Sequence, residues 1–96
     1  MRATIKNRQG NLMDTIRRGG YAYQGQEGDE LKFTKRLSND FYPRWHLIAK
    51  QDNENIILNL HLDQKRPSYQ GSHAHGGEYD SEIVEEELSR IKEFFK

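Results

Sequence analysis

The stretch that decides the fold is residues 44–63, RWHLIAKQDNENIILNLHLD. Apolar and polar residues alternate over 44–50 and again over 56–63, which is typical of two β-strands. The polar segment 51–55 between them predicts a tight turn, so the two strands should form a hairpin. Because successive side chains of a strand point to opposite faces, one face of the hairpin is expected to belong to the core. That core face carries Trp45, Leu47, Ala49, Ile56, Leu58, Leu60 and Leu62.

Two histidines lie on the other face of this hairpin. A turn around Asn53 leaves His46 opposite either Asn59 or His61, and the strand register decides which. In both registers His46 and His61 are close neighbours, opposite or diagonal. The sequence therefore predicts a histidine pair on the sheet face that is turned away from the core.

The residues before the hairpin predict a short helix and two more strands. Residues 12–18 carry an apolar stripe that Asn11 can cap, and Gly19-Gly20 supplies a helix end. Alternation over 21–24 and over 31–35 then predicts two strands joined by a turn.

The C-terminal residues show the clearest helical pattern. Val84, Leu88, Ile91 and Phe95 recur at the spacing of one helix face, after capping residues at 80–81. Such a face buries itself by packing on an apolar sheet face. We therefore expect this helix to lie on the core face of the hairpin.

Together these elements predict a single α+β domain in two layers. Its sheet is expected to be a four-stranded, mostly antiparallel meander, with the short N-terminal helix and the C-terminal helix packed on one face. Residues 1–10 are expected to form a mobile arm and residues 11–96 the domain. A long loop at 64–79 is a candidate for function, because structureless loops of this length are uncommon in compact domains.

Composition excludes several classes of protein. The 96 residues include no cysteine, which excludes disulfides, thiolate zinc sites and thiol catalysis. The longest apolar run is three residues, and the first ten residues have no apolar stretch, so we expect neither a membrane span nor a secretory signal. A soluble, cytoplasmic protein without an organic cofactor is the expectation.

Histidines and carboxylates near the loop predict a metal site. His73 and His75 are two residues apart, as are His61 and Asp63, and such pairs point the same way in an extended backbone. Imidazole and carboxylate groups are ligands for zinc and other divalent metals. The first hypothesis is therefore a zinc-like site that uses these four residues. The alternative is that the imidazoles are exposed loop residues or hydrogen-bond partners.

A metal with an open coordination position would allow hydrolysis, with Glu78 or Asp80 as the general base. The other hypotheses for this chain require no enzymatic activity.

The second hypothesis is binding of RNA or another single-stranded nucleic acid by a basic sheet face. Residues 1–50 carry ten Lys/Arg and five Asp/Glu, whereas residues 51–96 carry five and ten. A basic half attracts phosphates, although it can also pair with the acidic half, and the formal net charge is zero. Tyr21 and Tyr23 could stack on bases. The principal candidate residues are Lys32, Arg36, Arg44, His46, Lys50 and Tyr69.

A structural homodimer is the third hypothesis. Ile48 and Ile57 fall on the otherwise polar sheet face, where they should be adjacent. Two isoleucines in such a place are expected to be covered by the first helix or by a second copy of the chain.

Two stretches, Asn59–Lys65 (NLHLDQK) and Gly71–Asp80 (GSHAHGGEYD), resemble a group of short bacterial proteins. The resemblance covers less than half of the chain. It implies no particular activity, ligand or cofactor.

Overall fold

The computed structural model describes residues 1–8, 10–64 and 82–96. It confirms an α+β architecture with an antiparallel sheet and two helices, but the sheet has five strands and not four. In chain order the elements are β1 (Arg2–Lys6), α1 (Leu12–Arg18), β2 (Ala22–Glu27), β3 (Glu30–Arg36), β4 (Arg44–Asp52), β5 (Asn55–Asp63) and α2 (Glu82–Glu93).

The extra strand is β1, which the sequence analysis wrongly assigned to a mobile arm. The strand order is β1-β5-β4-β3-β2, so β1 forms one edge and pairs with β5 in antiparallel fashion. Ala3 pairs with Leu58 and Ile5 with Ile56, which places both on the core side of the sheet. This pairing joins residues more than fifty positions apart, so no local turn signal announces it.

The central hairpin of β4 and β5 agrees with the prediction. All seven residues predicted for its core face are buried. His46 pairs directly with His61, and Asp52 with Asn55, so the chain turns at residues 53–54. Asn53 occupies the left-handed region with a φ of 58°, a conformation that asparagine tolerates better than most residues.

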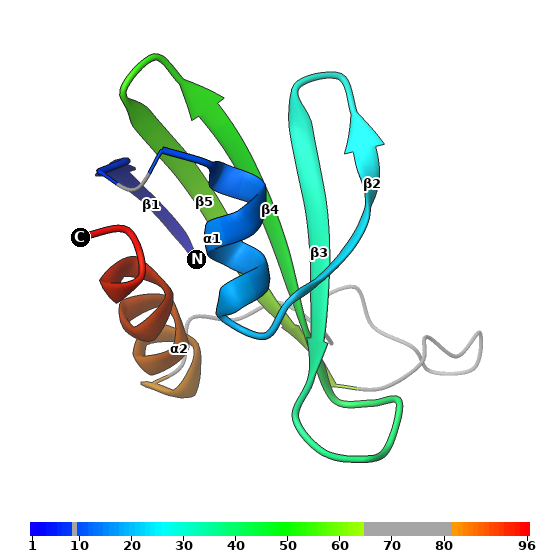
Figure 1. Ribbon diagram of the computed structural model, residues 1–96. Coiled ribbons are helices and arrows are strands. Elements are labelled where there is room, and N and C mark those ends of the chain that lie inside the picture. The colour runs from blue at the N-terminus through cyan, green and yellow to red at the C-terminus, as the bar shows by residue number, and fades with distance from the viewer. Residues whose placement is uncertain (9, 65–81) are drawn as a thin grey trace.

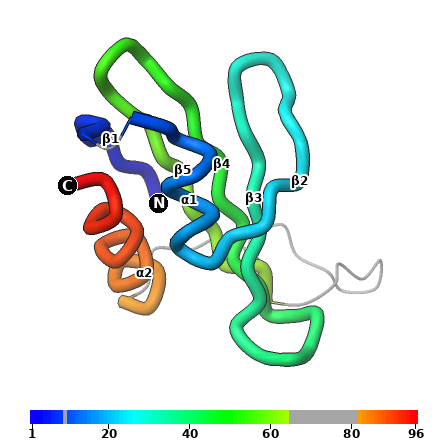
Figure 2. The backbone as a smooth tube through the Cα atoms, in the orientation of Figure 1, coloured from blue at the N-terminus to red at the C-terminus, as the bar shows by residue number. Residues whose placement is uncertain are grey.

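Both helices lie on the same face of the sheet (Figure 1), and the tube through the Cα atoms shows them side by side in front of the strands (Figure 2). In α1 the predicted cap is confirmed, because Asn11 Oδ1 accepts a hydrogen bond of 2.9 Å from the amide of Asp14. The left-handed residue after α1 is Gly20, with a φ of +98°. Leu12 and Ile16 contribute to the core from this helix.

Helix α2 completes the core. Val84, Leu88, Ile91 and the following Phe95 are all buried, as their spacing predicted. Ile83 stays 42% exposed because it lies on the opposite side of the helix. Within the described ranges, neither helix has the length and apolar character that crossing a membrane requires.

Candidate nucleic-acid interface

The sheet face turned away from α1 and α2 is the candidate site, and we call it the open face. Direct partners in an antiparallel sheet point to the same side, so the strand register fixes its members. They are Arg2, Thr4 and Lys6 in β1, Asn55, Ile57, Asn59, His61 and Asp63 in β5, Arg44, His46, Ile48, Lys50 and Asp52 in β4, Glu30, Lys32, Thr34 and Arg36 in β3, and Ala22, Gly25 and Glu27 in β2.

The open face is basic. Its six Lys/Arg residues stand against the four carboxylates Glu27, Glu30, Asp52 and Asp63, which leaves a net charge of +2. At one end two of the cations are paired, because Lys32 Nζ lies 2.7 Å from Glu27 at the end of β2 and Lys50 Nζ lies 3.6 Å from Asp29 in the β2–β3 turn.

Other cations of the open face are less compensated. Among the residues that the structure describes, Arg2, Lys6 and Arg36 have no carboxylate within ion-pair distance. The first two lie on the edge strand β1, and Arg36 lies at the end of β3. Positive charge is thus available on both sides of the centre of the sheet, where a chain of phosphates could bind.

His46 and His61 occupy the centre of this face. Their ring centroids are 6.3 Å apart, and both side chains are half-buried. Burial lowers the pKa of His46, and the positive charges of His61, Arg44 and Lys32 lower it further, against the opposing effect of Asp63. The lowered pKa favours the neutral form of His46, and a bound anion would favour its protonated form.

The two isoleucines of the open face are half-buried beside these histidines. Ile48 pairs with Asn59 and Ile57 with Lys50, so the isoleucines are diagonal neighbours. The expectation that the first helix covers them was wrong, because α1 packs on the opposite face, where its apolar stripe meets the core. Cover by a second copy of the chain stays a prediction.

Aromatic and guanidinium groups gather where β3 ends and β4 begins. The Phe41 ring lies 4.8 Å from that of Tyr42 in an edge-to-face arrangement, and Phe41 is 43% exposed. The guanidinium carbon of Arg36 lies 5.1 Å from the Phe41 ring centroid, and that of Arg44 lies 4.6 Å away. We call these four residues the aromatic–arginine cluster. The sequence analysis included both arginines but missed both aromatics, because they lie in a loop without a periodic pattern.

Arg44 connects this cluster to the histidine pair, because it lies two residues before His46 on β4. Its guanidinium is also 5.0 Å from the Tyr42 ring. The Nε atom is buried and has no hydrogen-bond partner in the described part of the chain, and Asp63 Oδ2 lies 3.9 Å from it. That separation is an ion-pair distance and not a hydrogen bond, so the buried Nε–H group is without an acceptor among the described residues.

Two tyrosines proposed for stacking do not lie on the open face. Tyr21 is buried, and its hydroxyl donates a hydrogen bond of 2.6 Å to Glu87 Oε2. Tyr23 lies against Phe33, a core residue, with the ring centroids 5.7 Å apart. Their roles are therefore structural, and Phe41 and Tyr42 take their place as candidate stacking residues.

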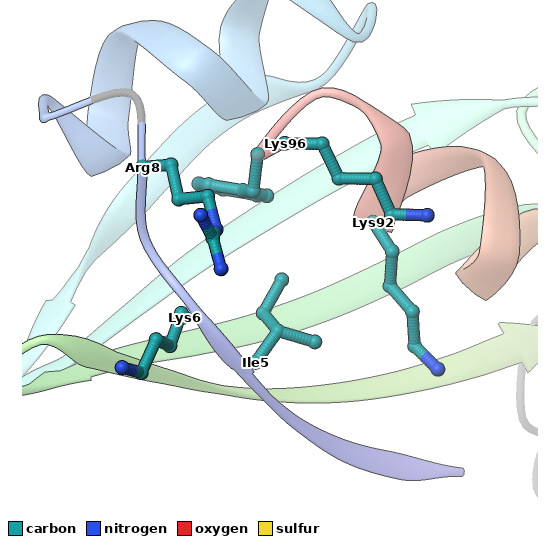
Figure 3. A pocket seen from close by; sticks show the side chains of 6 residues that line it. Ile5, Lys6, Arg8, Lys92 and Lys96 are labelled. Carbon is teal, nitrogen blue, oxygen red and sulfur yellow. The ribbon is translucent and has the colours of Figure 1, made fainter.

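A second group of cations surrounds a pocket at the edge of the sheet, between β1 and the end of α2. It is lined by Ile5, Lys6, Arg8, Lys92, Phe95 and Lys96. The lysine side chains point in different directions (Figure 3), and Lys96 forms an ion pair of 2.9 Å with Glu93. The pocket therefore offers positive charge without groups that converge on one point.

The predicted metal site is described only in part. His61 and Asp63 lie on the open face as predicted, with His46 beside them. The structure describes no group of three or more His, Asp or Glu side chains close enough to hold a metal ion within the ranges 1–8, 10–64 and 82–96. The other predicted site residues, His73, His75, Glu78, Asp80 and Tyr69, lie outside those ranges.

Comparisons with known proteins identify no family for this chain. The resemblance of two stretches to short bacterial proteins therefore stays a prediction. No protein-family model matches the chain, and no curated protein or solved structure is significantly similar to it.

Proposed function

We propose that the open face binds single-stranded nucleic acid. The observation that carries the proposal is that neither described helix covers this face and that it concentrates six Lys/Arg residues against four carboxylates, while the chain as a whole is neutral. Lysine and arginine bind phosphates with release of condensed counterions, which is the main source of affinity for a nucleic-acid backbone.

The shape of the surface favours a single strand. An open antiparallel sheet offers a broad platform on which unpaired bases can lie, whereas an element that enters a groove is needed to contact the bases of a duplex. The centre of the platform is formed by His46, His61, Ile48 and Ile57, which are half-buried and can contact base faces. The basic residues lie around that centre and can contact the backbone.

The proposal is tested by fluorescence anisotropy with labelled twelve-nucleotide RNA and DNA strands and the corresponding duplex, at several salt concentrations. The double variants Arg2→Gln/Lys6→Gln and Lys32→Gln/Lys50→Gln each remove two cations from the open face. Loss of two phosphate contacts should reduce the slope of log K against log salt by about 1.4, since each contact contributes about 0.7 for single strands.

The matched control is Arg17→Gln/Arg18→Gln, which removes two exposed cations from the last turn of α1. It changes the net charge equally but leaves the open face intact, so its salt slope should equal that of the unmodified protein. The proposal fails when the unmodified protein shows no salt-dependent binding, or when the control loses as much affinity as the open-face variants.

Binding of a divalent metal is a second candidate function, and the facing pair His46 and His61 favours it. Two imidazoles on one tetrahedral zinc ion have ring centroids about 5 Å apart, given Zn–N bonds of about 2.0 Å. The observed 6.3 Å is close to this value, and Asp63 lies two residues from His61. Sharing one ion would require the two rings to approach each other by about 1.3 Å.

Elemental analysis of untagged protein and thermal unfolding with and without EDTA test this second candidate. Near-stoichiometric metal, with a midpoint that falls on chelation, would support it. His46→Gln and His61→Gln should then each remove the effect of EDTA. Metal far below one equivalent together with an unchanged midpoint would exclude the site.

A further inference from the structure

The aromatic–arginine cluster combines an exposed ring with two guanidinium groups. Phe41 keeps 43% of its surface exposed although it is a large apolar residue. The guanidinium carbons of Arg36 and Arg44 already lie over its ring, at 5.1 and 4.6 Å from the centroid, so the part of the ring that stays exposed is the surface on which a nucleobase can stack. Leu37, in the same connection between β3 and β4, is similarly exposed at 41% but has no ring.

Charge in the cluster is also unbalanced. Arg36 and Arg44 are direct partners across β3 and β4, a position where two like charges oppose each other. The described residues place only Asp63 within ion-pair distance of either guanidinium, at 3.9 Å from Arg44. An anion bound between the two arginines would relieve this repulsion, and a phosphate accepts hydrogen bonds from guanidinium groups in a bidentate manner.

We infer that the aromatic–arginine cluster is a stacking site for one unpaired nucleobase, with Phe41 as the stacking platform and Arg36 and Arg44 as ligands of the adjoining phosphate. The Tyr42 ring supports the platform edge-on at 4.8 Å. This inference rests on the proposed function and adds to it the kind of contact that selects unpaired strands, because the base faces inside a duplex are already stacked.

The test separates stacking from attraction to phosphates. Anisotropy is measured with a twelve-nucleotide strand and with a strand of equal length and charge in which every base is absent. Stacking on an aromatic residue changes affinity by about 5-fold to about 100-fold per base. Phe41→Ala should therefore weaken binding of the normal strand by at least about 5-fold and leave binding of the abasic strand unchanged.

Two further variants make the result specific. Leu37→Ala removes a comparably exposed apolar side chain from the same loop and should leave both affinities unchanged. Phe41→Trp keeps a stacking surface, so it should retain binding and show quenching of its fluorescence by the normal strand. Parallel titrations with RNA, with DNA and with the free mononucleotide show which of these three ligands supplies the base that stacks.

The possible results distinguish failure of the stacking site from failure of single-strand binding, the proposed function on which the stacking site rests. When the unmodified protein binds neither strand, the proposed function fails and the stacking site with it. When it binds both strands equally and Phe41→Ala changes neither affinity, the stacking site alone is wrong. An equal loss for both strands in Phe41→Ala would likewise overturn stacking, because an abasic strand has nothing to stack.

Discussion

His46 and His61 lie directly opposite each other on neighbouring strands, with their ring centroids 6.3 Å apart at the centre of the open face. The pairing is a consequence of the two-residue turn at 53–54, which sets the register of the hairpin. His46 is half-buried in this position, and burial holds its pKa below the usual value. Protonation of His46 therefore links the charge of the open face to pH.

The first prediction concerns stability. Burial and nearby positive charge hold the pKa of His46 below its value in the unfolded chain, so the unfolded state binds more protons between these two values. The free energy of unfolding should therefore decrease as the pH falls below about 6.5, the ordinary pKa of histidine, and this contribution should level off below the lowered pKa. Urea unfolding at pH 7.5 and 5.5 measures the change.

His46→Gln is the matched control for this prediction. Glutamine cannot titrate, so the difference in stability between pH 7.5 and 5.5 should be smaller in the variant than in the unmodified protein. An identical pH dependence in the two proteins would show that His46 does not contribute to it.

The second prediction is that acid strengthens binding of nucleic acid. A phosphate near His46 stabilises its protonated imidazole, and by linkage protonation stabilises the complex. With His46 protonated in the complex, the salt slope for a single strand should become steeper by up to about 0.7 at pH 5.5 relative to pH 7.5. Anisotropy titrations at both pH values measure it.

The variant His46→Gln should show a smaller change of salt slope between the two pH values. A strengthening with acid that is as large in this variant as in the unmodified protein would assign the effect to other groups.

The third prediction concerns the buried contact between Tyr21 and Glu87. Burial raises the pKa of Glu87, but hydrogen bonds from Arg90 and Tyr21 outweigh this effect and hold the pKa below its usual value. Arg90 binds both carboxylate oxygens at 2.9 Å and also donates to the carbonyl of Gly19 at 2.9 Å, so the network ties α2 to the end of α1.

Tyr21→Phe keeps the ring in the core and removes only the hydroxyl. Loss of a buried hydrogen bond to a charged group should lower the free energy of unfolding by about 1.5–3 kcal/mol. Tyr23→Phe, at a residue that is 40% exposed, is the control and should change it by less than about 0.5 kcal/mol. Equal effects of the two substitutions in urea unfolding would contradict the structural role of the network.

Local patterns explain which parts of the fold could be predicted. The β4–β5 hairpin and α2 have strict periodicities of 2 and 3.6 residues, and both were predicted together with their core residues. Strand β1 has only Ala3 and Ile5 on its core side, and its partner β5 follows only after α1 and three other strands. A short strand of this kind is specified by tertiary pairing and not by its own sequence.

The candidate site shows the same division. His46, Arg44, Lys32 and Lys50 could be assigned to one face, because alternation fixes the face of a strand residue. Phe41 and Tyr42 could not, because the conformation of the loop that places them beside Arg44 has no sequence period. Glu87 was missed for another reason. A carboxylate in a charged helix is usually exposed, and the burial of Glu87 follows from its hydrogen bond with Tyr21, which lies far from it in the sequence.

The fourth prediction concerns the turn that sets the histidine register. Asn53 has a φ of 58°, in the left-handed region, where a side chain with a Cβ atom is strained and asparagine is among the better tolerated residues. Asn53→Ala should therefore lower the free energy of unfolding by about 1 kcal/mol, whereas Asn53→Gly should leave it within about 0.5 kcal/mol. Urea unfolding of the two variants provides the comparison, and a larger loss for glycine than for alanine would contradict the left-handed turn. Because neither substitution touches the open face, both variants should bind single strands as the unmodified protein does, provided that the register of His46 and His61 is retained.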